Sequence, residues 1–126
     1  MYTTKIVKDE MEITTIVDQA EVAFGENLSG TVYIEGCEDE AKIDFIQLEV
    51  VRKDRITGDE KTLLKHDIQM VGNVKSKQAE MIVFEIVPDD RWMEEPTTSE
   101  LILRTSLQLF GEEIMRAEDN FLYNNQ

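Results

Sequence analysis

Residues 28–35 read Leu-Ser-Gly-Thr-Val-Tyr-Ile-Glu and follow the turn sequence Gly25-Glu26-Asn27. Leucine, glycine, valine and isoleucine alternate along this segment with serine, threonine, tyrosine and glutamate. Successive side chains of a β-strand point to opposite faces, so a period of two indicates a strand with one face toward a core. Glycine and asparagine tolerate the backbone angles of tight turns. The sequence here therefore predicts a turn followed by a half-buried strand.

Six further segments show similar apolar alternation between turn residues. They are residues 12–17, 43–52, 62–71, 79–87, 101–109 and 120–123. The alternation changes phase within residues 43–52, as a β-bulge or a central strand buried on both faces produces. No segment has a convincing helical period, and strands joined by short turns favour an antiparallel sandwich. We predict an all-β fold, an antiparallel immunoglobulin-like β-sandwich of about seven strands.

One connection, residues 88–98, is much longer than the others. Because it contains Pro88 and Pro96, it cannot be a central strand, and its length predicts a crossing between the two sheets. It also contains Arg91, Trp92 and Met93, whose composition is typical of an interface anchor, and we predict that these residues bind a partner. In the alternative interpretation, Trp92 folds back and closes one open end of the sandwich. Exposed strand edges offer a second mode of partner binding.

The net charge of the chain indicates which classes of partner to expect. The chain has 126 residues, which suits one domain over residues 1–126, and 27 acidic against 13 basic residues give a formal charge of −14. Nucleic acids and anionic membrane surfaces are bound chiefly through clustered lysine and arginine, so neither is an expected partner. A basic partner is compatible with the charge. The excess acid also has a simpler role, because it keeps a β-protein soluble.

The location is predicted from what the chain lacks. Cys37 is the single cysteine and cannot form a disulfide within the chain, and the first residues lack the apolar stretch of a secretory signal. The longest apolar cluster, around residues 81–87, is far shorter than the roughly 20 residues that span a bilayer. We expect a cytoplasmic protein.

Catalytic residues are not predicted. His66, the only histidine, is in phase with Leu64, Ile68 and Met70, so its ring is expected at the edge of the core. The neighbouring carboxylates in residues 38–40 disfavour a Cys37 thiolate, which argues against a nucleophile.

No metal or cofactor is predicted either. One cysteine and one histidine cannot build a structural zinc site in one chain. Glu38, Asp39 and Glu40, or Asp89 and Asp90, are the candidates for calcium, but the Asp-x-Asp-x-Asp-Gly pattern is absent and solvated turn acids are favoured.

Residues 22–36 resemble the start of arrestin-like domains, where a glycine-acid turn leads into a strand reading apolar-x-Gly-x-apolar-x-apolar. Similar segments follow in order at residues 46–50, 84–88, 96–98 and 101–109. Over about residues 12–123 the chain is similar to the bacterial sporulation-control branch of the arrestin-like superfamily. It departs from these relatives at Phe24, where they usually carry proline, and at residues 101–102, which lack a frequent tryptophan.

The resemblance implies an arrestin-like β-sandwich equivalent to one lobe of a two-lobed architecture, because the chain ends where such relatives begin a second sandwich. It also implies a non-enzymatic regulatory scaffold that binds other proteins, or a second copy of itself as a homodimer. The alternative function is a small-ligand, carbohydrate- or calcium-binding module. Such modules usually expose a row of aromatic rings, whereas Tyr33, Trp92 and Tyr123 lie in unrelated segments.

Overall fold

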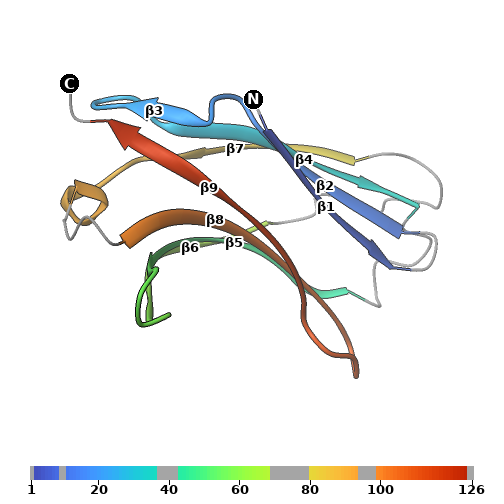
Figure 1. The fold of residues 1–126 in the computed structure, drawn as a ribbon. Coiled ribbons are helices and arrows are strands. Elements are labelled where there is room, and N and C mark those ends of the chain that lie inside the picture. Colours follow the sequence, from blue (N-terminus) through green and yellow to red (C-terminus); the bar gives the residue numbers. More distant parts are fainter. Residues whose placement is uncertain (1, 9–10, 37–42, 69–79, 94–98, 125–126) are drawn as a thin grey trace.

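Two β-sheets pack face to face in the computed structural model, which describes residues 2–8, 11–36, 43–68, 80–93 and 99–124 (Figure 1). The four-stranded sheet has the order β1 (Tyr2–Lys8), β2 (Met11–Val17), β4 (Leu28–Glu35) and β7 (Glu80–Ile86). The five-stranded sheet has the order β3 (Glu21–Ala23), β9 (Met115–Asn124), β8 (Ser99–Leu109), β5 (Ile43–Asp54) and β6 (Glu60–Asp67).

The prediction of an all-β antiparallel sandwich is confirmed in class and architecture, but the details differ. The described residues contain nine strands, not about seven, because β1 and β3 were not predicted. The last strand, β9, also begins earlier than predicted, at Met115. One pair, β3 with β9, is parallel, since the chain leaves the four-stranded sheet after β2 and joins the edge of the other sheet for three residues.

The core lies between the sheets and follows the predicted inward rows. Phe84 and Ile86 of β7 are buried, as are all five alternate residues of β8 from Leu101 to Leu109. Across the core, the hydroxyls of Thr15 and Thr105 form a buried hydrogen bond of 2.8 Å between the two sheets. This bond satisfies two polar groups that would be costly to bury alone.

Two register shifts explain irregularities in the apolar pattern. The phase change predicted within residues 43–52 corresponds to a shift in the β5–β8 ladder between Ile43 and Phe45. In the β5–β6 ladder, Val50 pairs with Leu64 and Val51 with Thr62, which leaves Leu63 as the extra residue of a bulge. Leu63 is buried while Leu64 is half-buried.

The prediction that His66 packs at the edge of the core is wrong, because its side chain is exposed. It faces the same side as Leu48, its partner in the ladder, but β6 is the outermost described strand of its sheet and gives the ring a neighbouring strand on one side only. Met70, predicted in the same row, lies outside the described residues.

The predicted crossing between sheets is confirmed, since the chain passes from β7 in one sheet to β8 in the other. It contains a short 3-10 helix, η2 (Asp90–Met93), which lies at one end of the sandwich (Figure 1).

Candidate protein-binding site

The edges of the two sheets differ in how their free backbone groups are protected. Among the described strands, four lie at a sheet edge: β1, β3, β6 and β7. Lysines, bulges and very short strands are the usual devices that prevent an edge from pairing with another chain. β1 carries Lys5 and Lys8, β3 is three residues long, and β6 combines Lys61 and Lys65 with the bulge at Leu63. Three of the four edges are therefore protected.

The fourth edge, β7, has none of these devices. Its sequence, Glu-Met-Ile-Val-Phe-Glu-Ile, contains no lysine or proline, and it pairs with β4 over seven consecutive residues without a register shift. The side chains of Met81 and Val83 point away from the core and are 60% and 71% exposed. β7 thus presents a regular edge flanked by an apolar outer row.

The outer face beside β7 is uncharged over two ladder rows. Residues paired across antiparallel strands lie on the same face. The two rows, read from β2 through β4 to β7, are Thr14, Tyr33 and Met81, then Ile16, Thr31 and Val83. The chain as a whole carries a formal charge of −14, so these two uncharged rows differ from its overall acidic character.

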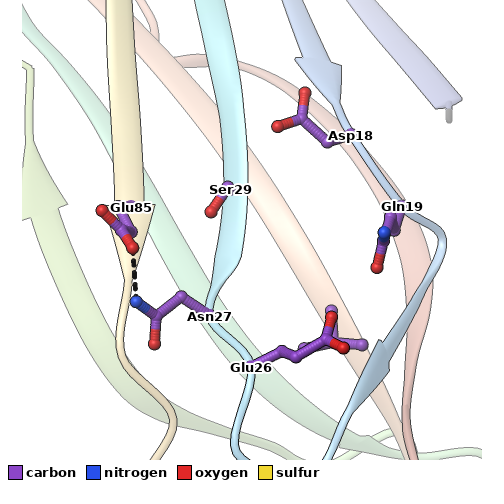
Figure 2. Close-up of a pocket in the computed structure, with 7 residues that line it drawn as sticks. Asp18, Gln19, Glu26, Asn27, Ser29 and Glu85 are labelled. Carbon is purple, nitrogen blue, oxygen red and sulfur yellow. Dashed lines mark hydrogen bonds between the residues drawn. The ribbon is translucent and has the colours of Figure 1, made fainter.

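The next row is acidic. Ser29 pairs with Glu85, and the carbonyl of Ser29 accepts a 3.0 Å hydrogen bond from the backbone N–H of Asp18, which extends the row beyond the end of β2. The two carboxylates line an open hollow of about 280 Å³. Its lining residues are Asp18, Gln19, Val22, Glu26, Asn27, Ser29 and Glu85 (Figure 2).

Within this hollow, the Asn27 side-chain amide donates a hydrogen bond to the carboxylate of Glu85, drawn as the dashed line in Figure 2. This bond links the turn before β4 to the outer row of β7. Val22 is buried, whereas Asp18, Glu26 and Glu85 are exposed. The hollow therefore joins an apolar buried residue to three carboxylates that remain in contact with solvent.

The predicted partner-binding residues Arg91, Trp92 and Met93 lie in η2. Trp92 is 2% exposed, and its ring packs edge-on against Phe121 and Tyr123 at centroid distances of 5.4 and 5.6 Å. This is the arrangement of the alternative interpretation, in which the indole closes one end of the sandwich. Met93 is half-buried.

Arg91 makes contacts within the chain. Its guanidinium forms a 2.7 Å ion pair with Asp89 and donates a hydrogen bond to the carbonyl of Leu63 on the β6 edge. The hydrogen bond from Arg91 lowers the pKa of the Asp89 carboxyl below its ordinary value. These contacts hold η2 against β6.

Arg52 of β5 also holds η2 in place. Its guanidinium donates hydrogen bonds to the hydroxyl of Ser99 at 2.9 Å and to the carbonyls of Arg91 and Trp92 at 3.0 and 2.6 Å. One side chain of β5 thus connects the crossing segment with the start of β8.

The most buried ion-pair network lies on the outer face of the five-stranded sheet. Arg104 of β8 donates hydrogen bonds to Glu60 of β6 at 2.7 Å and to Glu118 of β9 at 2.8 Å. The hydrogen bond from Arg104 lowers the pKa of Glu60. Because both carboxylates are already paired within the sheet, we interpret this network as structural.

The other residues considered in the sequence do not form a reactive or metal-binding group. Cys37 and residues 38–40 lie outside the described residues, and the Asp89 carboxylate is paired with Arg91. Within the described ranges, no three His, Cys, Asp or Glu side chains gather in a way that could hold a metal ion. No helix in the described part of the chain is long and apolar enough to cross a membrane.

Sequence reasoning missed the β7 edge and the acidic row. The sequence does show that residues 81–84 are four consecutive apolar residues without a lysine, but this pattern fits a central strand as well as an unprotected edge strand. Nothing local in the sequence brings Asp18, Ser29 and Glu85 together, because they belong to three different segments.

Comparison with known proteins identifies a family and solved structures with a similar fold. A family model described as SpoOM protein matches residues 8–112. The chain is similar to the crystal structure of Spo0M, sporulation control protein, from Bacillus subtilis, with a TM-score of 0.69 and 18% identity, covering 94% of this chain and 51% of that chain. The chain therefore spans about half the length of that protein.

A second solved structure, beta-glucosidase from Listeria innocua in complex with gluconolactone, aligns with a TM-score of 0.43 and 14% identity, covering 98% of this chain and 16% of that chain. A search of curated proteins returns no match.

Proposed function

Because the chain belongs to the SpoOM protein family and has an arrestin-like fold, we propose that it is a non-enzymatic regulatory protein of the cytoplasm that binds other proteins. The similar Bacillus subtilis protein is a sporulation control protein, and we propose a role of the same kind for this chain. The arrestin-like domain acts in this proposal as a scaffold and converts no substrate.

One observation carries the proposal: β7 is the edge that lacks the protection seen on β1, β3 and β6. An extended segment of a partner can add to such an edge as a further strand, with main-chain hydrogen bonds for affinity and side-chain contacts for specificity. The exposed side chains of Met81 and Val83 supply the apolar contacts on the outer face.

The proposal is tested with a displayed library of short peptides selected on the purified chain. Hydrogen exchange measured with an enriched peptide should show slower exchange at the amides of residues 80–86. The variant Val83→Lys places a charge on the edge and should weaken binding at least tenfold, since an exposed lysine is a natural barrier to edge pairing.

Val7→Lys is the matched control, because Val7 is 62% exposed on β1, an edge of the same sheet that already carries two lysines. It should bind the peptides like the unchanged chain. If no enriched peptide loses affinity in Val83→Lys, or if protection appears on another strand, the β7 edge is not the binding site.

The regulatory role needs a separate test in the source bacterium. Replacement of the chromosomal gene by the Val83→Lys form should change the number of heat-resistant spores to the level of a deletion, while Val7→Lys leaves it unchanged. A deletion strain with a normal spore count would contradict the sporulation role and leave the binding edge to be judged by the peptide experiment.

A further inference from the structure

On the outer face of the four-stranded sheet, the side chains along β7 change from apolar to acidic. Met81, Val83 and Glu85 alternate outward, and each is continued across the sheet by its ladder partners on β4: Tyr33, Thr31 and Ser29. The first two rows are uncharged and the third ends at Glu85 and Asp18. A strand added to β7 places its own outward side chains beside these three positions, because paired residues share a face.

The charge of Glu85 defines what the third position accepts, because Glu85 belongs to the strand beside the added one and also borders the hollow. Asp18, Glu26 and Glu85 all line it and all are exposed, so each keeps its charge accessible to a partner. Among the residues that line the hollow there is no lysine or arginine. Asp18 and Glu26 lie farther from the added strand, on the other side of Glu85. A lysine or arginine on the added strand therefore complements Glu85 directly, whereas an acidic side chain in that place is repelled.

We propose that the occupant of the β7 edge is a basic extended segment of a partner protein, with two alternating apolar residues beside Met81 and Val83 and a lysine or arginine beside Glu85. This proposal rests on the edge-binding function proposed above and names the partner's chemistry. A second copy of this chain fits less well, because each copy carries a formal charge of −14 and β7 itself offers no basic residue.

The order of residues follows from the strand direction. Antiparallel pairing is slightly more stable per residue than parallel pairing, and β7 already pairs with β4 in that sense. In an antiparallel strand, the residue beside Glu85 comes first and the residue beside Met81 comes last. The segment therefore reads basic-x-apolar-x-apolar from its amino end.

The test uses three labelled synthetic peptides at low salt. The first is Thr-Arg-Thr-Val-Thr-Val-Thr, the second has glutamine in place of arginine, and the third is the first in reverse order. Fluorescence anisotropy should show that the arginine peptide binds about fivefold more tightly than the glutamine peptide, as expected for an exposed charge pair. The reversed peptide should bind more weakly than the first.

Glu85→Gln keeps the shape of the side chain and its acceptor for Asn27, and should remove most of the difference between the arginine and glutamine peptides. Glu113→Gln is the control, because Glu113 is an exposed acid in the turn between β8 and β9, at the end of these strands remote from β3 and the hollow. It should leave the difference unchanged.

The outcomes separate the two proposals. If no forward peptide binds, or if binding does not slow the exchange of the amides in residues 80–86, the edge itself is not a binding site. If both forward peptides bind equally, or if the difference persists in Glu85→Gln, the edge stands and the basic position is wrong. If the reversed peptide binds best, the antiparallel order is wrong. If the free chain is a dimer at low salt that Val83→Lys dissociates, the occupant is a second copy.

Discussion

At the scale of single residues, Gly30 shows why the central strand requires glycine in its apolar row. It pairs with Val17 on one side and with Phe84 on the other. A Cβ atom at this position would collide with the backbone oxygen of Ile16 and lie 2.6 Å from Cζ of the Phe84 ring. The oxygen belongs to a ladder strand and the ring is buried, so neither has space to move.

We predict that Gly30→Ala lowers the free energy of unfolding by about 3 kcal/mol, the upper part of the usual range for overpacking a core. Urea denaturation followed by the fluorescence of Trp92, the single tryptophan, measures this loss. Gly58→Ala is the control: Gly58 has a φ of +79° with open space around it, so alanine there costs about 1 kcal/mol from backbone strain alone. Equal losses in the two variants would show that close packing at Gly30 is not what requires glycine.

At the scale of elements, the sequence predicts strands best where the two faces differ. β4 alternates cleanly, and its inward residue Val32 is buried as predicted; Phe84 of β7, also predicted to face inward, is buried as well. β1 was missed because Ile6 is its one buried residue, so the strand carries almost no alternation. β3 was missed because three residues are too few for a period, and its pairing with β9 is set by the tertiary fold.

The same limit applies to the candidate site. Alternation identified which residues of β7 face outward, but a strand's own pattern does not say whether another strand lies beside it. The protection of β6 also depends on a bulge at Leu63. The sequence does not reveal this bulge, because Leu63 and Leu64 are consecutive apolar residues. Edge position and register are properties of the assembled sheet, so the open edge became visible only in the structure.

Another element-scale feature is the attachment of η2, for which we predict that Arg52 is decisive. Arg52→Met removes the donors to the carbonyls of Arg91 and Trp92. Hydrogen bonds from charged groups contribute about 1.5–3 kcal/mol each, part of which solvent replaces when the carbonyls are freed. The amide of Trp92, which donates to the Asp89 carbonyl at 3.1 Å, should exchange at least tenfold faster, and the tryptophan emission should shift to longer wavelength.

Arg116→Met removes an exposed arginine of β9 and should leave both signals unchanged. If Arg52→Met instead unfolds the whole sandwich in one step without faster local exchange at Trp92, then η2 is an inseparable part of the core. The hypothesis that Arg52 controls the local opening of η2 would then be abandoned.

At the scale of the whole molecule, the formal charge of −14 opposes the pairing of two copies through the β7 edge. Repulsion between copies is long-range when salt is low, because the Debye length is about 30 Å at 10 mM salt and about 3 Å at 1 M. The edge contacts are main-chain hydrogen bonds and apolar side-chain packing, both short-range, so salt screens the repulsion and leaves the attraction. The net charge thus opposes self-association, whereas the β7 edge favours it.

We therefore predict that light scattering gives the mass of one chain at about 10 mM sodium chloride and an increasing average mass toward about 1 M. Val83→Lys should remain a single chain at both salt concentrations, while Val7→Lys should follow the unchanged protein. A dimer at low salt would mean that the attraction exceeds the repulsion of the whole charge. An increase in mass that Val83→Lys does not prevent would place self-association on a surface other than β7, and the unprotected edge would then have no role in the oligomeric state.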